Sequence, residues 1–340
     1  MSKTKYIIFA LLIAGVVSLL TYLNYDKIKL YLINREWEIA DSLGKIEIEN
    51  YIDTLGTNSG LFVVTSGAIQ GYADNTKKIM EKPISMKETV SDVAGDYAII
   101  AEKNATDLYV ISRNEVAWNT SINNGSILSV SINKNGYSAI IYSQAGYKSL
   151  IKVFSNTGKE LFTSYLASTY AIDVSISNDN RTLAVAEIDT SGISLVSRIK
   201  LIEIQAASES NIQKYDLEKD ELISQIEYNK NNQLIIMTDI GIKELKNNTV
   251  TEIINFKNEK IIMANIDDAN NIVTAKIKEE RLFSVKCAIS IYQSDTLNIE
   301  KTYELEETPN QIVSWENMIA IDTGNKILFL NSMRKYGQKV

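Results

Sequence analysis

One short pattern recurs along most of the chain and restricts its possible folds more than any other feature. An apolar strand that contains a small polar residue leads into a turn of Asn, Asp, Gly and Ser, and a more hydrophobic strand follows. The clearest copies are Leu128–Tyr142, Ile172–Ala186, Ile223–Met237 and Met263–Ala275, and weaker copies are Tyr51–Val64, Val90–Ala101 and Ile312–Ile321. The hydrophobic strands fall near residues 61, 98, 139, 183, 234, 272 and 318, so the copies lie 37 to 51 residues apart.

The residues between these copies predict two further strands in each repeat. An alternating or aromatic-rich third strand follows, as in Ser149–Phe154, and then a more polar fourth strand, as in Glu160–Thr163. Four short strands in each period of about 40 to 50 residues are typical of a propeller blade. One such sheet cannot bury both faces alone, so copies stack until a ring closes. The sequence therefore predicts an all-β fold over residues 45–335, a seven-bladed β-propeller of four-stranded antiparallel blades, with a tail over residues 336–340.

Closure of the ring needs a fourth strand for the last blade, whose own three strands end near Leu330. Lys45–Glu49 alternates cleanly between charged and apolar residues and precedes the first blade. It is one candidate for that outer strand, and Arg334–Val340 is the other. The sequence leaves both possibilities open.

An uncharged stretch, Tyr6–Leu23, precedes the repeats. At about 1.5 Å per residue, roughly 18 to 20 helical residues cross a hydrocarbon core of about 30 Å. Tyrosines lie at both ends, where aromatic rings favour the membrane interface. The alternative, a cleaved signal peptide, has a shorter apolar run followed by a small-residue cleavage site, and neither is found here. We therefore expect a short tail over residues 1–5 and a single transmembrane helix over residues 6–25.

Residues 26–44 predict a juxtamembrane helix or linker, because apolar residues recur there at an imperfect 3.6-residue spacing. Lysines and arginines occur on both sides of the span, so their number gives the span no orientation. The N-terminal tail is short and the following domain is large. We therefore expect the propeller on the extracytoplasmic side of the cell membrane.

The composition excludes several kinds of chemistry. The chain has no histidine, which removes the usual general base, the histidine-activated nucleophiles and the commonest zinc ligand. Its only cysteine, Cys287, lies in an apolar alternating run, which predicts a buried and inert thiol. The net charge is −7 and no basic run is found, which argues against a nucleic-acid partner. We expect no metal and no cofactor, and carboxylates remain the main catalytic option.

Ser175–Ala186, which reads SISNDNRTLAVA, and its related copies resemble the repeat of YVTN-type and TolB-type bacterial β-propellers. The layout of one N-terminal span and a propeller is similar to that of uncharacterised membrane-anchored propeller proteins of Gram-positive anaerobes. The resemblance covers about residues 45–335 and implies the fold without an activity. The chain departs from the WD repeat, since it has no Gly-His or Trp-Asp dipeptide, and tryptophan is too scarce for the quinone-enzyme type.

First strands of propeller blades line the central channel, so their polar residues are the candidate ligand-binding residues. We place Asp53, Asp92, Ser129, Asp173, Ser224 and Ser314 at roughly equivalent positions. Pointing inward together, they would form a polar rim able to hold a cation or another ligand. The alternative is that small polar residues simply suit a narrow, wet channel.

Two other groups of residues have a structural and a functional interpretation. Asn178–Asn180 and Asp267–Asn271 look like fragments of calcium loops, but their spacing lacks the full pattern, and tight hairpin turns use the same residues. Five tyrosines, Tyr137, Tyr142, Tyr147, Tyr165 and Tyr170, cluster in two neighbouring repeats. Such clusters occur at binding surfaces, but packing between blades is the interpretation that we favour.

The sequence supports two hypotheses about function. The first is a non-enzymatic platform on the membrane that binds a protein or an envelope polymer, because the chain combines a rigid scaffold and an anchor with no recognisable catalytic motif. The alternative is a hydrolase or lyase of cell-envelope carbohydrate, with carboxylates at the channel mouth. A deep axial pocket with converging acids would favour the enzyme, and a shallow aromatic face would favour the platform.

Overall fold

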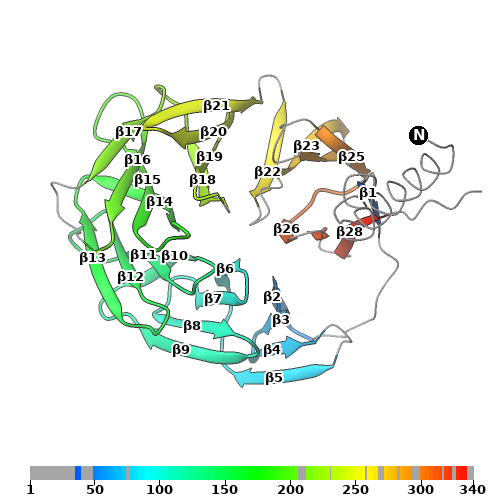
Figure 1. The fold of residues 1–340 in the computed structure, drawn as a ribbon, viewed down its shortest axis with the longest axis horizontal. Coiled ribbons are helices and arrows are strands. Elements are labelled where there is room, and N and C mark those ends of the chain that lie inside the picture. Colours follow the sequence, from blue (N-terminus) through cyan, green and yellow to red (C-terminus); the bar gives the residue numbers. More distant parts are fainter. Residues whose placement is uncertain are drawn as a thin grey trace, which may run out of the picture.

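The computed structural model describes residues 35–39, 49–73, 77–205, 212–229, 231–256, 259–266, 272–281, 284–292, 299–315, 318–323 and 327–334. These residues contain 28 strands and no helix. The strands form four-stranded antiparallel sheets that are arranged around a ring, as Figure 1 shows. We call these sheets blades and number them in chain order.

Six blades are each made of four consecutive strands. Blade 1 contains β2 (Tyr51–Thr57), β3 (Gly60–Thr65), β4 (Ala68–Tyr72) and β5 (Lys78–Pro83). Blade 2 contains β6 (Thr89–Ala94), β7 (Tyr97–Glu102), β8 (Asp107–Ser112) and β9 (Glu115–Ser121). Blade 3 contains β10 (Ser126–Ile132), β11 (Ser138–Ser143), β12 (Ser149–Phe154) and β13 (Glu160–Leu166).

The next three blades continue in the same way. Blade 4 contains β14 (Thr169–Ile176), β15 (Thr182–Asp189), β16 (Val196–Glu203) and β17 (Gln213–Asp216). Blade 5 contains β18 (Ile223–Tyr228), β19 (Leu234–Thr238), β20 (Gly241–Lys246) and β21 (Thr249–Asn255). Blade 6 contains β22 (Lys260–Ile266), β23 (Ile272–Arg281), β24 (Ser284–Tyr292) and β25 (Ile299–Leu305).

Blade 7 is composite, because it combines strands from the two ends of the described chain. It contains β26 (Gln311–Trp315), β27 (Met318–Asp322), β28 (Ile327–Arg334) and β1 (Arg35–Ile39). β1 pairs antiparallel with β28, with Arg35 opposite Arg334 and Ile39 opposite Leu330. β1 therefore supplies the outer strand that completes this sheet.

The predicted fold class needs two corrections. Only six blades arise from single repeats, and the outer strand of blade 7 comes from neither segment proposed for it. In addition, Arg35–Ile39 is a strand within the predicted juxtamembrane helix. Its sequence REWEI alternates charged and apolar residues from Glu36 onward, which suits an outer strand beside the free edge of β28.

Several predictions fall outside the described residues. The predicted tail and transmembrane helix over 1–25 lie outside them, and so do residues 45–48 of the proposed outer strand and the tail over 336–340. Within the described ranges, no helix has the length and the apolar character needed to cross a membrane.

The sequence repeat predicted the positions of the second strands well. The second strands begin at residues 60, 97, 138, 182, 234, 272 and 318, close to the positions predicted for them. These strands are buried on both faces, and β11, for example, has five of its six residues buried. Outer strands such as β9 alternate between exposed and half-buried residues. The core therefore consists of apolar layers between neighbouring blades, such as the cluster that joins Ile99 of blade 2 to Ile140 of blade 3.

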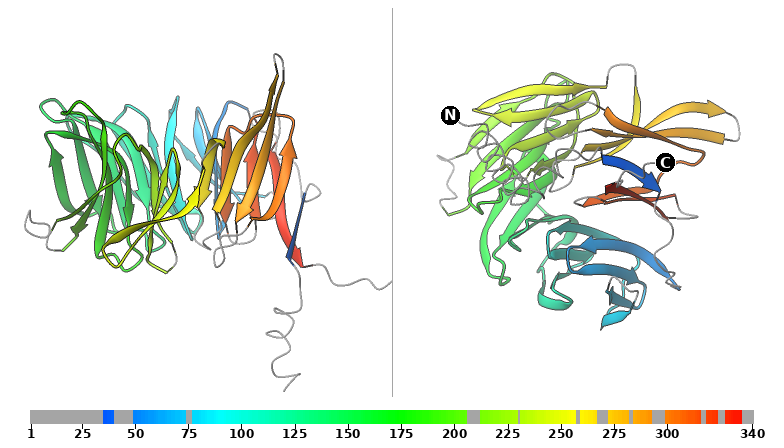
Figure 2. Two further views of the ribbon diagram at one scale, coloured as in Figure 1. Left: turned by 90° about the horizontal axis from the view of Figure 1, so that it is seen from above. Right: turned by 45° about the vertical axis from the view of Figure 1, so that its right-hand side comes forward.

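The ring has two distinct faces, and Figure 2 shows its strands running between them in the edge-on view. We call the face at which first strands begin the start face. It also carries the connections between second and third strands. The turn face carries the hairpins between first and second strands, such as Asn133–Tyr137 and Ser177–Arg181. Because β1 runs antiparallel to β28, it begins at the turn face and ends at the start face.

Candidate functional site

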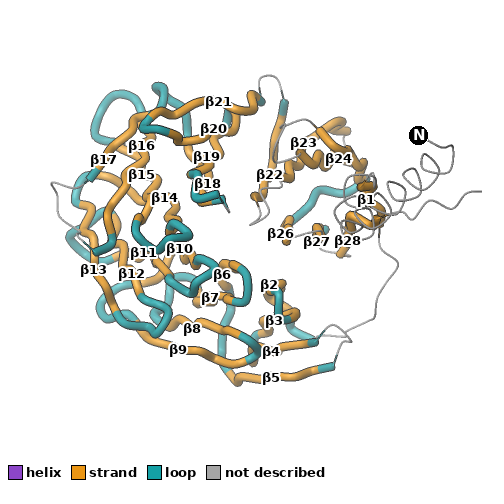
Figure 3. Tube along the Cα trace, in the orientation of Figure 1, coloured by secondary structure: helices purple, strands orange, loops and turns teal. Residues whose placement is uncertain are grey.

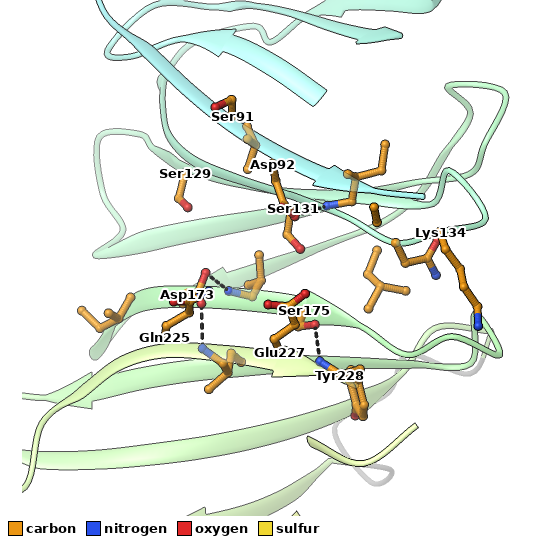
Figure 4. A pocket seen from close by; sticks show the side chains of 18 of the residues that line it. Ser91, Asp92, Ser129, Ser131, Lys134, Asp173, Ser175, Gln225, Glu227 and Tyr228 are labelled. Atoms are coloured by element: carbon orange, nitrogen blue, oxygen red, sulfur yellow. Dashed lines mark hydrogen bonds between the residues drawn. The ribbon is translucent and has the colours of Figure 1, made fainter. Parts of the chain in front are cut away.

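Four neighbouring first strands line a cavity of about 300 Å³ at the centre of the ring. They are β6, β10, β14 and β18, from blades 2 to 5. Figure 4 shows polar side chains from these strands around the cavity. Those that matter below are Ser91, Asp92, Ser129, Ser131, Lys134, Asp173, Ser175, Ser224, Gln225, Glu227 and Tyr228.

Asp173 on β14 joins blade 4 to blade 5. Its Oδ1 accepts a hydrogen bond from the backbone N–H of Val174 at 2.9 Å. Its Oδ2 accepts one from the backbone N–H of Ile226 on β18 at 2.8 Å. Two residues farther along, the hydroxyl oxygen of Ser175 accepts from the backbone N–H of Tyr228 at 3.1 Å. These bonds satisfy backbone donors at the inner edge of blade 5, where no strand of its own sheet is available.

Asp53 and Asp92 also join neighbouring blades, Asp92 through a backbone N–H group and Asp53 through side-chain hydroxyls. Asp92 on β6 accepts from its neighbour Val93 at 2.8 Å and from the backbone N–H of Ile132 on β10 at 2.8 Å. Asp53 on β2 accepts from the hydroxyl of Ser91 at 2.5 Å. We call Asp53, Asp92 and Asp173 the junction aspartates, because each one bonds the next blade.

The six predicted residues are only partly equivalent in position. In three first strands, pairing with the second strand starts again immediately after a bulge, at Asp53, Ser129 and Asp173. Ser224 lies within the corresponding bulge of β18. Asp92 bonds Ile132, which is three residues beyond Ser129, so it corresponds to Ser175 rather than to Asp173.

The cavity brings together four of the six predicted residues. Asp92, Ser129, Asp173 and Ser224 line it. Asp53 lies outside the lining and reaches it only through its hydrogen bond to Ser91. Ser314 belongs to β26, and its side chain is outside the described part of the structure. A ligand-binding role for these residues stays a prediction, and the hydrogen bonds to the next blade give the junction aspartates a structural role.

The sequence analysis missed Ser131, Ser175 and Gln225, which lie on the same strands and line the cavity. A period-two reading of the first strands could have found the two serines, since Ser129 and Ser131, like Asp173 and Ser175, share a face of their strand. Gln225 was missed because the bulge in β18 shifts the alternation by one residue.

Burial raises the pKa of the Asp173 carboxyl to about 7, and the nearby Asp92 carboxylate adds to this rise. The backbone hydrogen bonds from Ile226 and Val174 act in the opposite direction, because they favour the ionised form. Burial therefore has a larger effect on the pKa of Asp173 than the two hydrogen bonds have. Asp173 changes its charge near neutral pH.

The turn face carries a chain of amide hydrogen bonds that link the hairpins of blades 3, 4 and 5. The side-chain amide of Asn133 donates to Asn180 Oδ1 at 2.7 Å, and that of Asn178 donates to the carbonyl oxygen of Asn229 at 2.7 Å. Asn180 has a φ of 61°, the left-handed conformation that asparagine tolerates. The interpretation of Asn178–Asn180 as a turn is thus confirmed.

The described residues contain no group of three or more His, Cys, Asp or Glu side chains that could hold a metal ion. The second calcium-like fragment, Asp267–Asn271, lies outside these residues. Cys287 is buried, as predicted.

The five clustered tyrosines divide into two groups. Tyr142 is buried in the core between blades 2 and 3, and Tyr137 packs against the core between blades 3 and 4. Both agree with the packing interpretation. The other three are exposed, and for them that interpretation was wrong: Tyr147, Tyr165 and Tyr170 have exposed fractions of 42%, 57% and 40%.

These three tyrosines lie together on the start face of blades 3 and 4. The ring centroids of Tyr147 and Tyr165 are 5.1 Å apart. Lys148 Nζ lies 4.7 Å from the ring centroid of Tyr170 and donates a hydrogen bond to its hydroxyl at 2.9 Å. We define the tyrosine patch as Tyr147, Lys148, Tyr165 and Tyr170, whose three tyrosines are all exposed.

Comparison with known proteins supports the fold and gives no activity. The model of a family of unknown function, DUF5711, matches residues 32–336. None of the curated proteins is similar in sequence to this chain.

Solved structures share the fold of this chain at low sequence identity. The β-propeller domain of Cps50 (Swd1) from Myceliophteria thermophila is 10% identical with a TM-score of 0.58, covering 85% of this chain and 98% of its own. Hydrazine synthase from Kuenenia stuttgartiensis is 9% identical with a TM-score of 0.56, covering 88% and 100%. AztD from Citrobacter koseri is 12% identical with a TM-score of 0.53, covering 86% of each chain. At these identities the likeness extends to the propeller fold, and the finer resemblance to YVTN-type and TolB-type repeats stays a prediction.

Proposed function

The chain belongs to the DUF5711 family, whose function is unknown, and from its geometry we propose that it is a non-enzymatic platform that binds another protein through the tyrosine patch. The propeller fold is compatible with such a role. The observation that carries the proposal is the exposure of three neighbouring tyrosines on one face of a rigid ring.

The two faces differ in their exposed apolar side chains. Among the large hydrophobic residues exposed in the described part of the chain, nine lie on the start face: Tyr51, Leu128, Tyr147, Tyr165, Tyr170, Ile172, Ile193, Leu195 and Ile240. Contiguous exposed apolar side chains with aromatic rings at their centre are typical of protein interfaces. The tyrosines contribute contact area at a low cost in conformational entropy, since each has only two side-chain torsions.

The charge around the patch also supports a protein partner. The start-face segments of blade 3 and early blade 4, residues 121–128, 143–148 and 165–172, contain one charged residue, Lys148. Interfaces between proteins are depleted of charge at their centre, whereas surfaces that bind nucleic acid or anionic lipid are rich in Lys and Arg.

The channel geometry gives less support to the carbohydrate-cleaving alternative. Asp92 and Asp173 both use their carboxylate oxygens to accept backbone N–H groups of the neighbouring strands. A glycosidase needs one carboxylic acid to protonate the leaving group and a second carboxylate to attack or to activate water. The junction role holds these side chains in place for structure instead.

We also propose that the platform is held in the cell membrane by residues 6–25, with the propeller on the extracytoplasmic side. The support is the uncharged stretch of the sequence, which is long enough to cross a bilayer as a helix. Protease added to intact protoplasts should remove a tag placed at the C-terminus. A tag that is protected until lysis would contradict this orientation and direct the partner search to cytoplasmic proteins.

A photo-crosslinking amino acid tests the binding surface directly. We would place benzoylphenylalanine at Tyr165 on the start face, or at Lys159 on the turn face of the same blade, as the matched control. We expect a protein adduct in cells from position 165 and not from position 159. The adduct should weaken when Tyr147 and Tyr170 are replaced by serine.

The other outcomes are informative as well. Equal adducts from both positions, or an adduct insensitive to the serine substitutions, would contradict the tyrosine patch as the binding surface. An adduct that wall-degrading enzymes remove and proteases leave intact would identify an envelope polymer as the partner. Turnover of a wall polymer by the purified protein would contradict the non-enzymatic role.

A further inference from the structure

We propose that the channel cavity lined by β6, β10, β14 and β18 binds a small organic cation that carries a primary ammonium group. This site is separate from the tyrosine patch, so its failure would leave the platform proposal standing. Figure 4 shows the side chains on which the proposal rests.

The first observation is a hydroxyl that is open to the cavity and has no hydrogen-bond partner in the described part of the protein. Ser131 on β10 is 8% exposed and lines the cavity, and its side chain bonds no other group of the described residues. Buried polar side chains are normally hydrogen-bonded, so an unpaired one inside a cavity points to a missing partner. Ser129 and Gln225 line the same cavity and are likewise unpaired within the described part of the chain.

The second observation is the charge of the lining. Asp92, Asp173 and Glu227 line the cavity, against one cation, the exposed Lys134. The field inside is therefore negative, which excludes an anion as the ligand. Burial disfavours the charged form of the Asp173 carboxyl, and a bound cation would stabilise that form.

The hydrogen-bond acceptors of the cavity limit the chemical class of the ligand further. An ammonium group donates three hydrogen bonds and accepts none. The cavity offers acceptors from separate strands: the hydroxyl oxygens of Ser129 and Ser131, the amide oxygen of Gln225, and the remaining lone pairs of the Asp173 carboxylate. A bare divalent ion fits less well, since no group of three or more acidic, histidine or cysteine side chains suited to a metal exists in the described residues.

The size of the cavity limits the ligand to a small molecule. A volume of about 300 Å³ corresponds to about ten water molecules at ~30 Å³ each. An amino alcohol of four to ten non-hydrogen atoms is within that range, by the same rough measure. A peptide or a polymer chain is too large.

Three probes of matched size test the charge of the ligand. Ethanolamine, ethylene glycol and glycolate are similar in size and differ in charge, being cationic, neutral and anionic. Calorimetry on the full-length protein in detergent micelles should show binding of ethanolamine at about pH 8 and no comparable binding of the other two. At about pH 5.5, where Asp173 is mostly protonated, the affinity for ethanolamine should fall about tenfold.

Other titratable side chains line the cavity together with Asp173, and they come from neighbouring strands. Asp92 comes from β6, Lys134 from β10, and Glu227 and Tyr228 from β18. Burial raises the pKa of the Asp173 carboxyl to about 7, which lies inside the tested range. Asp173→Asn should therefore remove both the binding at about pH 8 and its pH dependence.

Two further variants keep the test independent of folding. Ser131→Ala removes a hydroxyl that bonds no protein group, so the fold should be unchanged while ethanolamine binds about fivefold more weakly. Asp53→Asn removes a junction aspartate outside the cavity and should leave the affinity unchanged. Equal binding of ethylene glycol, no binding of ethanolamine at millimolar concentration, or full affinity in Ser131→Ala would overturn the proposal.

Discussion

At the scale of single residues, the junction aspartates show how a propeller satisfies the inner edge of its blades. The innermost strand of each blade has no neighbour in its own sheet on the channel side, so its backbone N–H groups need other acceptors. Asp92 and Asp173 supply carboxylate oxygens to the next blade at 2.8 Å. Sequence analysis identified these residues as channel-lining but not as junctions, since the acceptor role depends on a strand about 40 to 50 residues away.

Asp173 should make the stability of the propeller depend on pH. Its pKa is about 7 in the folded state, above the ordinary value of 3.8, so the folded protein binds more protons than the unfolded chain between these values. The free energy of unfolding therefore falls as pH rises through that window. Denaturant midpoints at about pH 5 and about pH 7.5 should show the decline, and Asp173→Asn should flatten it.

Asp53→Asn is the matched control for this measurement, because it also removes hydrogen bonds between two blades. It should lower the midpoint at both pH values and keep the wild-type slope. The interpretation fails if the two variants flatten the pH dependence equally.

Gly241 should tolerate no side chain at the turn between β19 and β20. A Cβ there would lie 2.3 Å from the carbonyl oxygen of Ile254, which belongs to the adjacent strand and cannot move freely. Gly241→Ala should lower the free energy of unfolding by about 1–3 kcal/mol, the usual cost of overpacking. Gly67→Ala in the corresponding turn of blade 1 is the control, since nothing lies within 4 Å of its added Cβ. Equal midpoints for the two variants would contradict this account.

At the scale of elements, the second strands were predictable and the closing strand was not. A buried central strand is a continuous apolar run between turn residues, so the positions of all seven second strands were predicted. Arg35–Ile39 is five residues long, and a stretch of that length fits either a helical stripe or an alternating strand. Only the free edge of β28, about 300 residues away in the chain, decides between them.

A disulfide should confirm the pairing of β1 with β28. Glu36 lies opposite Met333 in the register, so Glu36→Cys with Met333→Cys should form a disulfide on mild oxidation, in a Cys287→Ala background. Glu36→Cys with Asn331→Cys is shifted by two residues along β28 and should react much less. Mobility in non-reducing electrophoresis measures both. Equal yields would contradict the register.

At the scale of the whole molecule, the ring separates two surfaces with different chemistry. The turn face is built from hairpins tied together by asparagine amides, whereas the start face exposes tyrosines and aliphatic side chains. The sequence predicted the ring but not this asymmetry. Exposure of a given tyrosine depends on where each loop falls on a face, and residue type alone carries no such information, as Tyr142 and Tyr165 show.

The direction of β1 predicts which face lies nearer the membrane, if residues 6–25 form the proposed anchor. The chain reaches β1 at the turn face, so the start face should lie farther from the bilayer by about the length of a seven-residue strand, ~23 Å. Fluorescent labels at Lys159→Cys or Tyr165→Cys, in a Cys287→Ala background, report the two faces of one blade. Quencher-labelled lipids in liposomes should quench the label at position 159 more strongly. Equal quenching would contradict this orientation.

The composite blade also determines how the ring responds to mechanical load. A pull on the chain before Arg35 acts along the axis of β1, and the hydrogen bonds to β28 run perpendicular to that axis. The five residue pairs between Arg35 and Ile39 are then loaded together in shear, rather than opened one after another. The strand that closes the ring is thus oriented to resist tension applied to the chain that precedes it.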